Sequence, residues 1–228
     1  MTKKLLLLAC AHIGHKNVDY EALDRYLEWA KKGGHKILLL GDIFEVGLPQ
    51  KANKMMEQNL IIDEQFDRGV ALFLPYAKQI IGQCTSNHSN RVWETVGFDL
   101  DKAFANTLKI PYFAMNGQVL WEGKKVTFHH GFGAGVNEWG DAQKLLTNYP
   151  DSDIVAVSHR HYMATSAFQN NLNKRTHLVN FVRSGSLIKK ARYADMAQYQ
   201  GRPNGFAVVE NKNGTIRMDV SGVPWEFE

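Results

Sequence analysis

The sequence predicts an α/β fold in which two β-sheets pack together and are flanked by helices. In the first half, apolar runs alternate with stretches of helical periodicity, an order typical of a parallel sheet covered by helices. In the second half, short paired strands indicate more antiparallel pairing. The 228 residues are 44% hydrophobic, which is enough for one sizeable core, and we find no repeat or linker. A single domain over residues 1–228 is therefore predicted.

The first half supplies three predicted strands and two predicted helices. Residues 5–10 and 36–40 are apolar runs that end at polar residues, as buried strands do. Between them, residues 18–32 repeat leucine and alanine at helical spacing and end before two glycines. A second helix is predicted over residues 51–78, and a third strand over residues 79–84.

The second half begins with a predicted pair of strands, residues 113–122 and 124–130, joined around a glycine. A helix is predicted over residues 137–148 and a buried strand over residues 153–157. Further strands are predicted at residues 177–183, 206–210 and 215–220, the last two joined by a hairpin turn at Asn213 and Gly214.

Charge and cysteine content narrow the class of protein. The net charge of +4 and pI of 8.9 suit an anionic substrate, but they are too small to establish nucleic-acid binding. The two cysteines, Cys10 and Cys84, form neither a CxxC motif nor a zinc-ribbon spacing, which favours a reducing compartment. The apolar run after Lys4 is shorter than a signal-peptide core, and no run approaches the ~20 apolar residues of a membrane span. We therefore expect a cytoplasmic protein with no membrane partner.

Side chains that commonly bind metals follow the end of one predicted strand after another. They are Cys10 and His12, Asp42, Asn87 and His88, His130, and His159 and His161. Open α/β sheets hold their ligands at the carboxyl ends of strands, so five strands would bring these side chains to one rim. This convergence is stronger evidence than any single motif.

These residues lie in five motifs that resemble those of the calcineurin-like metallophosphoesterases, which read D-x-H, G-D-x-x, G-N-H-[DE], H-G and G-H-x-H. The segments here are Cys10-Ala11-His12, Gly41-Asp42-Ile43-Phe44, Ser86-Asn87-His88-Ser89, His130-Gly131 and Ser158-His159-Arg160-His161. They span residues 10–161, and residues 87–97 resemble a subgroup common in bacteriophages and their hosts. The resemblance implies a four-layer αββα sandwich of the metallophosphoesterase type.

The resemblance also implies a centre for two divalent metal ions, with Mn, Zn, Fe and Mg all open as the identity. By position, the first ion would be held by His12 and His161, the second by Asn87, His130 and His159, and both by Asp42. A hard carboxylate can bridge two cations, while neutral imidazoles fill other positions and leave an open face for phosphate.

The implied reaction is hydrolysis of a phosphomonoester or phosphodiester by a hydroxide that bridges the two metals, without a covalent enzyme intermediate. His88 resembles the family's non-ligand histidine, which stabilises the transition state or protonates the leaving oxygen. Arg91 and Arg160 are predicted phosphate contacts, because a guanidinium fork matches phosphate geometry. Nucleic acid, nucleotides and phosphoproteins all remain possible substrates, and the oligomeric state is not predicted.

Two features depart from the family pattern. Cys10 stands where the family has a metal-binding aspartate. A thiolate there would favour softer ions such as zinc or iron over manganese or magnesium, whereas a merely small, buried Cys10 would weaken the first site. Ser86 and Ser158 also replace glycines, and Ser89 replaces the acidic residue after the histidine.

Two alternatives to the dinuclear enzyme stay open. One is a degenerate member that keeps the fold as a binding module, as the retromer subunit of this superfamily does. The other is an enzyme that uses only the second metal. Outside the motifs, His15 is expected to be structural or at the surface. Glu45 is expected to be a solvated carboxylate, with a contact behind a metal ligand as the alternative. His129 is expected to face away from the site occupied by His130.

Overall fold

The computed structural model describes residues 3–48, 56–131, 138–171, 176–189 and 205–220. Its first sheet contains β1 (Lys4–Leu8), β2 (Lys36–Leu39), β3 (Ile80–Cys84), β4 (Tyr112–Phe113), β10 (Ala207–Lys212) and β11 (Thr215–Asp219). The strand order in this sheet is β11-β10-β1-β2-β3-β4. Strands β1 to β4 are mutually parallel, and the β10–β11 hairpin returns to pair antiparallel with β1.

The second sheet contains β5 (Asn116–Trp121), β6 (Lys124–His129), β7 (Ile154–Val157), β8 (Ala164–Asn170) and β9 (His177–Arg183), in the order β5-β6-β7-β9-β8. Strands β6, β7 and β9 are parallel, while β5 and β8 pair antiparallel at the two edges. The helices are α1 (Tyr20–Lys32), α3 (Ile62–Phe73), α4 (Asn87–Val96), α5 (Leu100–Leu108) and α6 (Glu138–Asn148), and a 3₁₀ helix, η2 (Leu74–Gln79), follows α3.

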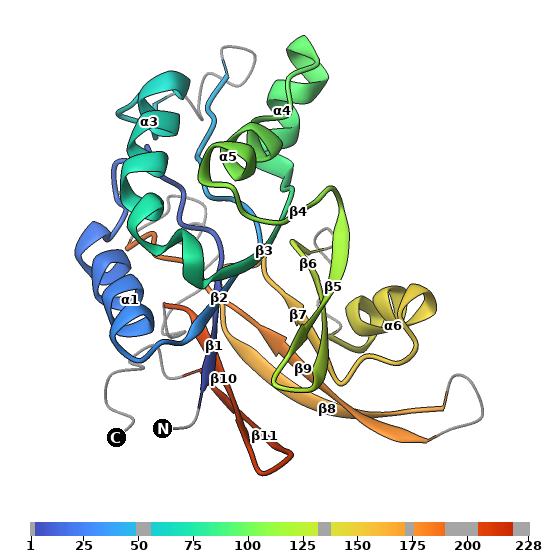
Figure 1. The fold of residues 1–228 in the computed structure, drawn as a ribbon. Helices are drawn as coiled ribbons and strands as arrows, with labels where there is room; N and C mark the ends of the chain where they lie inside the picture. The colour runs from blue at the N-terminus through green and yellow to red at the C-terminus, as the bar shows by residue number, and fades with distance from the viewer. Residues whose placement is uncertain (1–2, 49–55, 132–137, 172–175, 190–204, 221–228) are drawn as a thin grey trace.

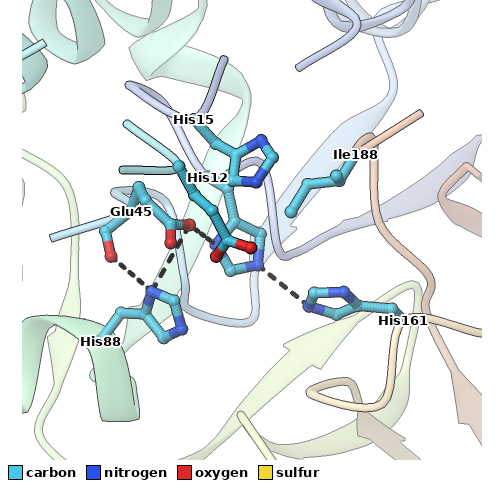
Figure 2. A pocket seen from close by; sticks show the side chains of 7 residues that line it. His12, His15, Glu45, His88, His161 and Ile188 are labelled. Carbon is cyan, nitrogen blue, oxygen red and sulfur yellow. Dashed lines mark hydrogen bonds and ion pairs between the residues drawn. The ribbon is translucent and has the colours of Figure 1, made fainter. Parts of the chain in front are cut away.

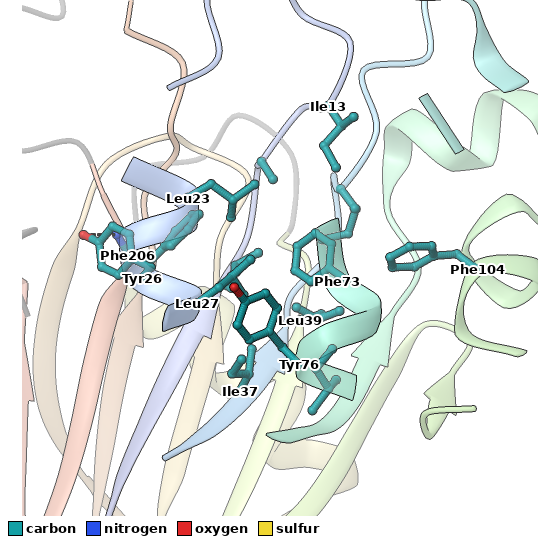
Figure 3. Packing of buried hydrophobic residues seen from close by; sticks show 14 of the residues in the cluster. Ile13, Leu23, Tyr26, Leu27, Ile37, Leu39, Phe73, Tyr76, Phe104 and Phe206 are labelled. Atoms are coloured by element: carbon teal, nitrogen blue, oxygen red, sulfur yellow. Dashed lines mark hydrogen bonds between the residues drawn. The ribbon is translucent and has the colours of Figure 1, made fainter. Parts of the chain in front are cut away.

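The apolar side chains of β1 divide between two separate cores, because successive residues of a strand point to opposite faces. Leu6 and Leu8 pack against the helices that cover the first sheet, and Figure 3 shows that core around Leu23 of α1. Leu5 and Leu7 instead face the second sheet. A third cluster joins α6 to the outer face of β7 and β9. The layer order is helices, sheet, sheet, helix, so the predicted αββα sandwich is confirmed (Figure 1).

The parallel pairing places several strand ends on one edge. β1 pairs with β2 in a register that sets Leu8 opposite Leu39, and β3 continues the sheet in the same direction. β6 and β7 are likewise parallel in the second sheet. The segments that follow these five strands carry the motifs found in the sequence. Among the described residues, no helix combines the length and apolar character that crossing a membrane requires.

The predicted helix over residues 51–78 is confirmed only from Ile62 onward, where α3 and then η2 follow, and it is wrong for residues 56–61. Residues 49–55 lie outside the described part of the chain, and the helix begins only at Ile62. Before it, the backbone bonds to the segment after β1, with Lys16 N donating to Glu57 O at 2.9 Å and Asn59 N to Gly14 O at 2.8 Å. After α3 the chain tightens into η2, which has a proline in its first turn.

The helices α4 and α5 and the strand β8 were not predicted. α4 starts inside the Asn87-His88 motif and ends at Gly97, whose left-handed φ of 70° closes the helix. Asp99 then caps α5 by accepting a hydrogen bond from Lys102 N. Both of these helix signals are present in the sequence.

The hairpin turn between β10 and β11 is confirmed. Asn213 and Gly214 both have left-handed φ angles, 53° and 84°. A two-residue turn of this kind needs positive φ at both central positions, and asparagine followed by glycine is the pair that adopts it most readily. The sequence alone therefore located this turn.

Candidate metal centre

The segments that follow β1 and β2 run side by side, and their pairing brings the first two motifs together. His12 N donates to Asp42 O at 3.0 Å, and Ile13 N donates to Ile43 O at 2.7 Å. Glu45 N returns a hydrogen bond to Ile13 O at 3.0 Å. This short ladder continues the parallel pairing past the sheet edge, so the side chains of the D-x-H-like and G-D motifs share one location.

Left-handed backbone is concentrated at this location. The φ angles are 48° at Cys10, 49° at His12, 49° at Asp42, 73° at His159 and 52° at His161. Residues with a Cβ rarely adopt this region, and each such residue costs on the order of 1–3 kcal/mol. The surrounding hydrogen bonds must therefore hold these residues in place, as is common at functional sites.

Ligand atoms gather in two groups that share Asp42. One group consists of Cys10, His12, Asp42 and His161, and the other of Asp42, His130 and His159, with ligand atoms within 4.8 Å of one another in each. His130 Nε2 lies 3.0 Å from Asp42 Oδ2, and His12 Nε2 lies 3.9 Å from the same oxygen. Asp42 thus stands between two sets of imidazoles, in the arrangement that a bridging carboxylate needs.

The spacing of the imidazoles fits divalent cations. His12 Nε2 faces His161 Nε2 at 3.0 Å, and His130 Nε2 faces His159 Nδ1 at 3.2 Å. Two imidazole nitrogens bound to one tetrahedral zinc ion at about 2.0–2.1 Å lie about 3.3 Å apart. Each facing pair therefore has the separation of two ligands on one ion. The buried sulfur, nitrogen and carboxylate donors are of the types that bind zinc-like cations.

Neighbouring groups orient the ligands. His130 Nδ1 is hydrogen-bonded to Leu40 O at 2.7 Å, which directs Nε2 toward Asp42. Gly41 has a φ of 86°, and a Cβ there would come within 2.9 Å of His130 Nδ1, so only glycine permits this approach. Glu45 Oε2 lies 2.8 Å from His12 Nδ1. Such outer contacts fix the ring orientation of metal-binding histidines.

The buried charges of the centre are coupled. Burial alone would raise the pKa of Asp42, but His130 and His88 hold it well below its usual range. Burial would lower the pKa of His130, yet the Asp42 carboxylate outweighs burial and raises that pKa to about 9. For His12, burial is likewise overcome, by contacts with Cys10 and Glu45 that raise the pKa to about 10. The ionised carboxylates of Asp42 and Glu45 therefore favour positive charge on the groups around them.

His88 lies at the edge of this centre and lines a pocket beside it. Burial lowers the pKa of His88 to about 4, so its ring is neutral at physiological pH. Its Nδ1 is hydrogen-bonded to Glu45 O, and its backbone N donates to Asp42 Oδ1 at 3.2 Å. Figure 2 shows His12, Glu45, His88 and His161 pointing toward one another. The pocket is lined by His12, His15, Glu45, Glu57, His88, His161 and Ile188.

The remaining motif residues lie around this cluster. Asn87 is the first residue of α4, and its side chain is exposed. Arg91 Nη1 donates to Val46 O at 3.1 Å, on the loop that follows β2. Arg160 Nη2 lies 3.4 Å from Asp141 Oδ2, so this guanidinium pairs with helix α6. Arg91 therefore belongs to the helix that follows β3 of the first sheet, and Arg160 to the loop that follows β7 of the second.

Two residues outside the motifs belong to the surroundings of the centre. Glu45 was expected to be solvated, and that expectation is wrong: the structure shows it 1% exposed beside His12, in the position of the alternative, a contact behind a candidate ligand. The apolar residues Phe44 and Val46 on either side of Glu45 were the signal for burial. His15, expected to be structural or at the surface, is buried and lines the pocket.

His129 was expected to face away from the site that His130 occupies. Its ring accepts a hydrogen bond from Gly131 N at 2.8 Å, whereas the His130 ring contacts Asp42. The ligand groups found among the described residues include His130 and do not include its neighbour. The alternation of side chains along β6 therefore accounts for which of the two histidines reaches the centre.

The fold resembles several solved structures. No family model and no curated protein matches the sequence. Among solved structures, a novel archaeal phosphodiesterase matches with a TM-score of 0.53 and 12% identity, covering 95% of this chain and 99% of that one. The E. coli phosphoesterase YfcE matches with a TM-score of 0.52 and 16% identity, covering 95% and 98%.

A third similar structure is vacuolar protein sorting 29 (Vps29) from Cryptosporidium parvum, with a TM-score of 0.51, 14% identity and 96% of both chains covered. Identities this low establish a shared architecture. The topology, the layer order and the ligand groups at the strand ends all agree with that architecture. This chain therefore has the fold of the calcineurin-like metallophosphoesterases.

Proposed function

We propose that this chain is a dinuclear metal-dependent phosphoesterase that hydrolyses phosphomonoester or phosphodiester bonds. The observation that carries the proposal is the sharing of Asp42 by two ligand groups, one with His12 and His161 and one with His130 and His159. The similarity in fold to an archaeal phosphodiesterase and to YfcE supports the same reaction class.

In this proposal, Asp42 would be shared by two cations, Cys10, His12 and His161 would hold the first, and Asn87, His130 and His159 would hold the second. When bound, the cations supply an activated water and neutralise the charge of the phosphate. The water oxygen forms the new bond to phosphorus, the ester P–O bond breaks, and the leaving oxygen takes up a proton that the water loses. The neutral His88 ring donates its Nδ1 proton to Glu45 O, so Nε2 is free to accept the water proton and pass it to the leaving oxygen.

Substrate contacts are proposed for Arg91 and Arg160. Arg91 lies on α4, three residues after His88, and is anchored to the loop that follows β2. Arg160 lies between two proposed ligands, His159 and His161. The net charge of +4 supports an anionic substrate, and a nucleotide or a nucleic acid is the substrate class proposed.

The test is hydrolysis of p-nitrophenyl phosphate and of bis-p-nitrophenyl phosphate with added manganese, together with the metal content of the purified protein. We expect about two bound ions per chain and turnover. Asp42→Asn should lower turnover by at least about 100-fold, because removing the shared carboxylate disrupts both sites. Asp67→Asn, at an exposed position of α3, is the matched control and should keep full activity. Equal activity in both variants would contradict the proposal.

A binding module is the second candidate. It is favoured by Cys10, which replaces the aspartate of the family motif, and by the fold shared with Vps29. If the protein purified without metal and showed no turnover of either substrate with added manganese or zinc, this candidate would replace the enzyme.

An enzyme that uses only the second metal is also separable by experiment. In that case Cys10→Ala would leave turnover nearly unchanged, and one ion per chain would support full activity. A dinuclear enzyme instead requires both ions, so turnover should rise with the second equivalent of metal added.

A further inference from the structure

Two residues that differ from the family motifs are in contact with each other. Cys10 replaces an aspartate and Ser158 replaces a glycine, and Cys10 Sγ lies 3.2 Å from Ser158 Oγ in the folded chain. Both residues are buried, with exposed fractions of 0% and 1%. Two residues that lie 148 positions apart in the sequence, and that both differ from the family motifs, are therefore in contact in the folded chain.

The position of the Cys10 sulfur is set by the backbone around it. Cys10 N donates to Gly41 O at 3.0 Å, and Cys10 O accepts from Ser186 Oγ at 2.9 Å. The left-handed φ of 48° turns the side chain away from the path of β1. This backbone conformation is shared with His12 and Asp42, which indicates that Cys10 is built into the centre in the same way as they are.

The sulfur makes the two halves of the centre chemically different. Cys10 joins His12, Asp42 and His161 as a set of one sulfur, two imidazoles and one carboxylate. The group on the other side of Asp42 offers imidazoles and contains no sulfur. Soft thiolate ligands favour zinc, iron and similar ions, whereas magnesium and manganese favour oxygen ligands.

Ser158 provides a hydrogen bond that suits a bound thiolate. Its hydroxyl lies 3.2 Å from Ser184 O as well as 3.2 Å from Cys10 Sγ. A hydroxyl hydrogen can rotate between two acceptors. It can therefore point either at the Ser184 carbonyl or at a metal-bound Cys10 sulfur. A hydrogen bond of this kind orients and stabilises a metal-bound ligand.

The other buried cysteine offers a comparison within the same chain. Cys84 is also 0% exposed, but its sulfur lies 3.9 Å from Leu39 O in the core between the sheets. None of the ligand groups found among the described residues includes it. Burial raises the pKa of the Cys84 thiol well above its usual range, so it remains a thiol.

The geometry points to a thiophilic cation site in this half of the centre, with Cys10 as a thiolate ligand supported by the Ser158 hydroxyl. The site takes a zinc- or iron-like ion in preference to manganese or magnesium, and the two halves differ in metal preference. This inference rests on the proposed function only in that the chain binds divalent cations.

The test is titration of the purified, metal-stripped protein with cobalt(II). A thiolate bound to cobalt gives a sulfur-to-metal charge-transfer absorption in the near ultraviolet, separate from the visible bands that report cobalt binding by any ligands. The wild type and the control Cys84→Ala should show both absorptions. Cys10→Asp and Cys10→Ser should keep the visible bands and lose the charge-transfer absorption.

Metal preference is measured in the same proteins by competition with a chromophoric chelator. The ratio of zinc to manganese affinity should fall by at least about tenfold in Cys10→Asp, and zinc affinity should fall by about tenfold in Ser158→Ala.

Three outcomes of these titrations would overturn the thiolate site. If the wild type showed the visible cobalt bands without the charge-transfer absorption, the thiolate site would be overturned and the proposed phosphoesterase function would be unaffected. Charge transfer that persists in both Cys10 variants would likewise overturn the thiolate site alone. The absence of any cobalt binding would overturn the thiolate site and the proposed function together.

Discussion

Glu45 illustrates how a carboxylate behind a ligand prepares a centre for metal. Its backbone N donates to Ile13 O and also to Gln65 Oε1 at 3.1 Å, so the residue is held from two sides. Its side chain then lies 2.8 Å from His12 Nδ1. A carboxylate in this position fixes the imidazole orientation and increases its basicity as a ligand.

We predict that Glu45→Gln lowers divalent-cation affinity by about 10- to 100-fold, the usual effect of losing such a partner. The affinity is measured by isothermal titration calorimetry with zinc. Glu57→Gln is the matched control, because Glu57 lines the same pocket, and its affinity should stay close to that of the wild type. If the two variants bind zinc equally well, Glu45 does not support His12.

The placement of the candidate ligands could be predicted because each follows the end of a strand. Asp42 and His130 follow strands of different sheets. Parallel pairing brings strand ends to a common edge within each sheet, and the packing of the two sheets brings the two edges together. The burial of Glu45 could not be predicted from its own chemistry, since a lone carboxylate is usually solvated. Its burial follows from the ladder between two loops, which depends on pairing outside the regular strands.

The connection between α1 and β2 contains a buried histidine that is held in its neutral form. His35 is 6% exposed and packs on Trp29, with ring centroids 4.5 Å apart. Its Nδ1 accepts a hydrogen bond from Lys4 N at 3.3 Å, a role that a protonated nitrogen cannot fill. Burial, reinforced by the charges of Lys4 and Lys3, lowers the pKa of His35 to about 4.

This shift predicts acid sensitivity. The pKa of His35 is 6.5 when unperturbed and about 4 in the folded chain, so the unfolded state binds the proton first as pH falls. The neutral His35 ring contributes fully to the free energy of unfolding above pH 6.5, and this contribution is lost as the pH falls from 6.5 toward 4. Between about pH 7 and pH 5, the free energy of unfolding of His35→Gln should therefore fall by about 1–2 kcal/mol less than that of the wild type. Urea unfolding at the two pH values measures both. Identical losses would contradict this assignment.

The elements differ in how well the sequence predicts them. β1 is a run of four leucines after Lys4, and its burial on both faces leaves little choice of structure. α4 is short and mostly polar, with Val92 as its buried apolar residue, so its helical period is hidden among site residues. The helix predicted over residues 51–78 begins later than expected, because the segment before Ile62 bonds to the loop after β1. The single domain and the cytoplasmic location remain predictions.

The outer helix layer of the sandwich is tied to the second sheet by a buried arginine. Arg183 of β9 is 0% exposed, and its two terminal nitrogens lie 2.9 Å from Asp141 Oδ2 and 2.9 Å from Glu138 Oε1 of α6. Its guanidinium also stacks on Tyr162, 4.8 Å from the ring centroid. The layers are therefore joined by a charge pair as well as by the apolar contacts of α6.

We predict that Arg183→Met destabilises the fold by about 3 kcal/mol, because it leaves the buried Asp141 carboxylate without its closest partner. Urea unfolding measures the free energy. The control is Lys125→Met, which removes an exposed ion pair with Asp151 and should cost less than about 1 kcal/mol. If the two variants lost equal free energies of unfolding, the buried ion pair of Arg183 would stabilise the fold no more than the exposed pair of Lys125.

The left-handed backbone at the centre sets stability and chemistry against each other. Glycine adopts this conformation freely, so His159→Gly or His161→Gly should relieve local strain while removing a donor atom. Selection for fold stability alone would favour glycine at these positions. That histidines occupy them instead is the mark of a requirement other than folding, and it means that a graft of this centre onto another scaffold must copy the loop path together with the side chains.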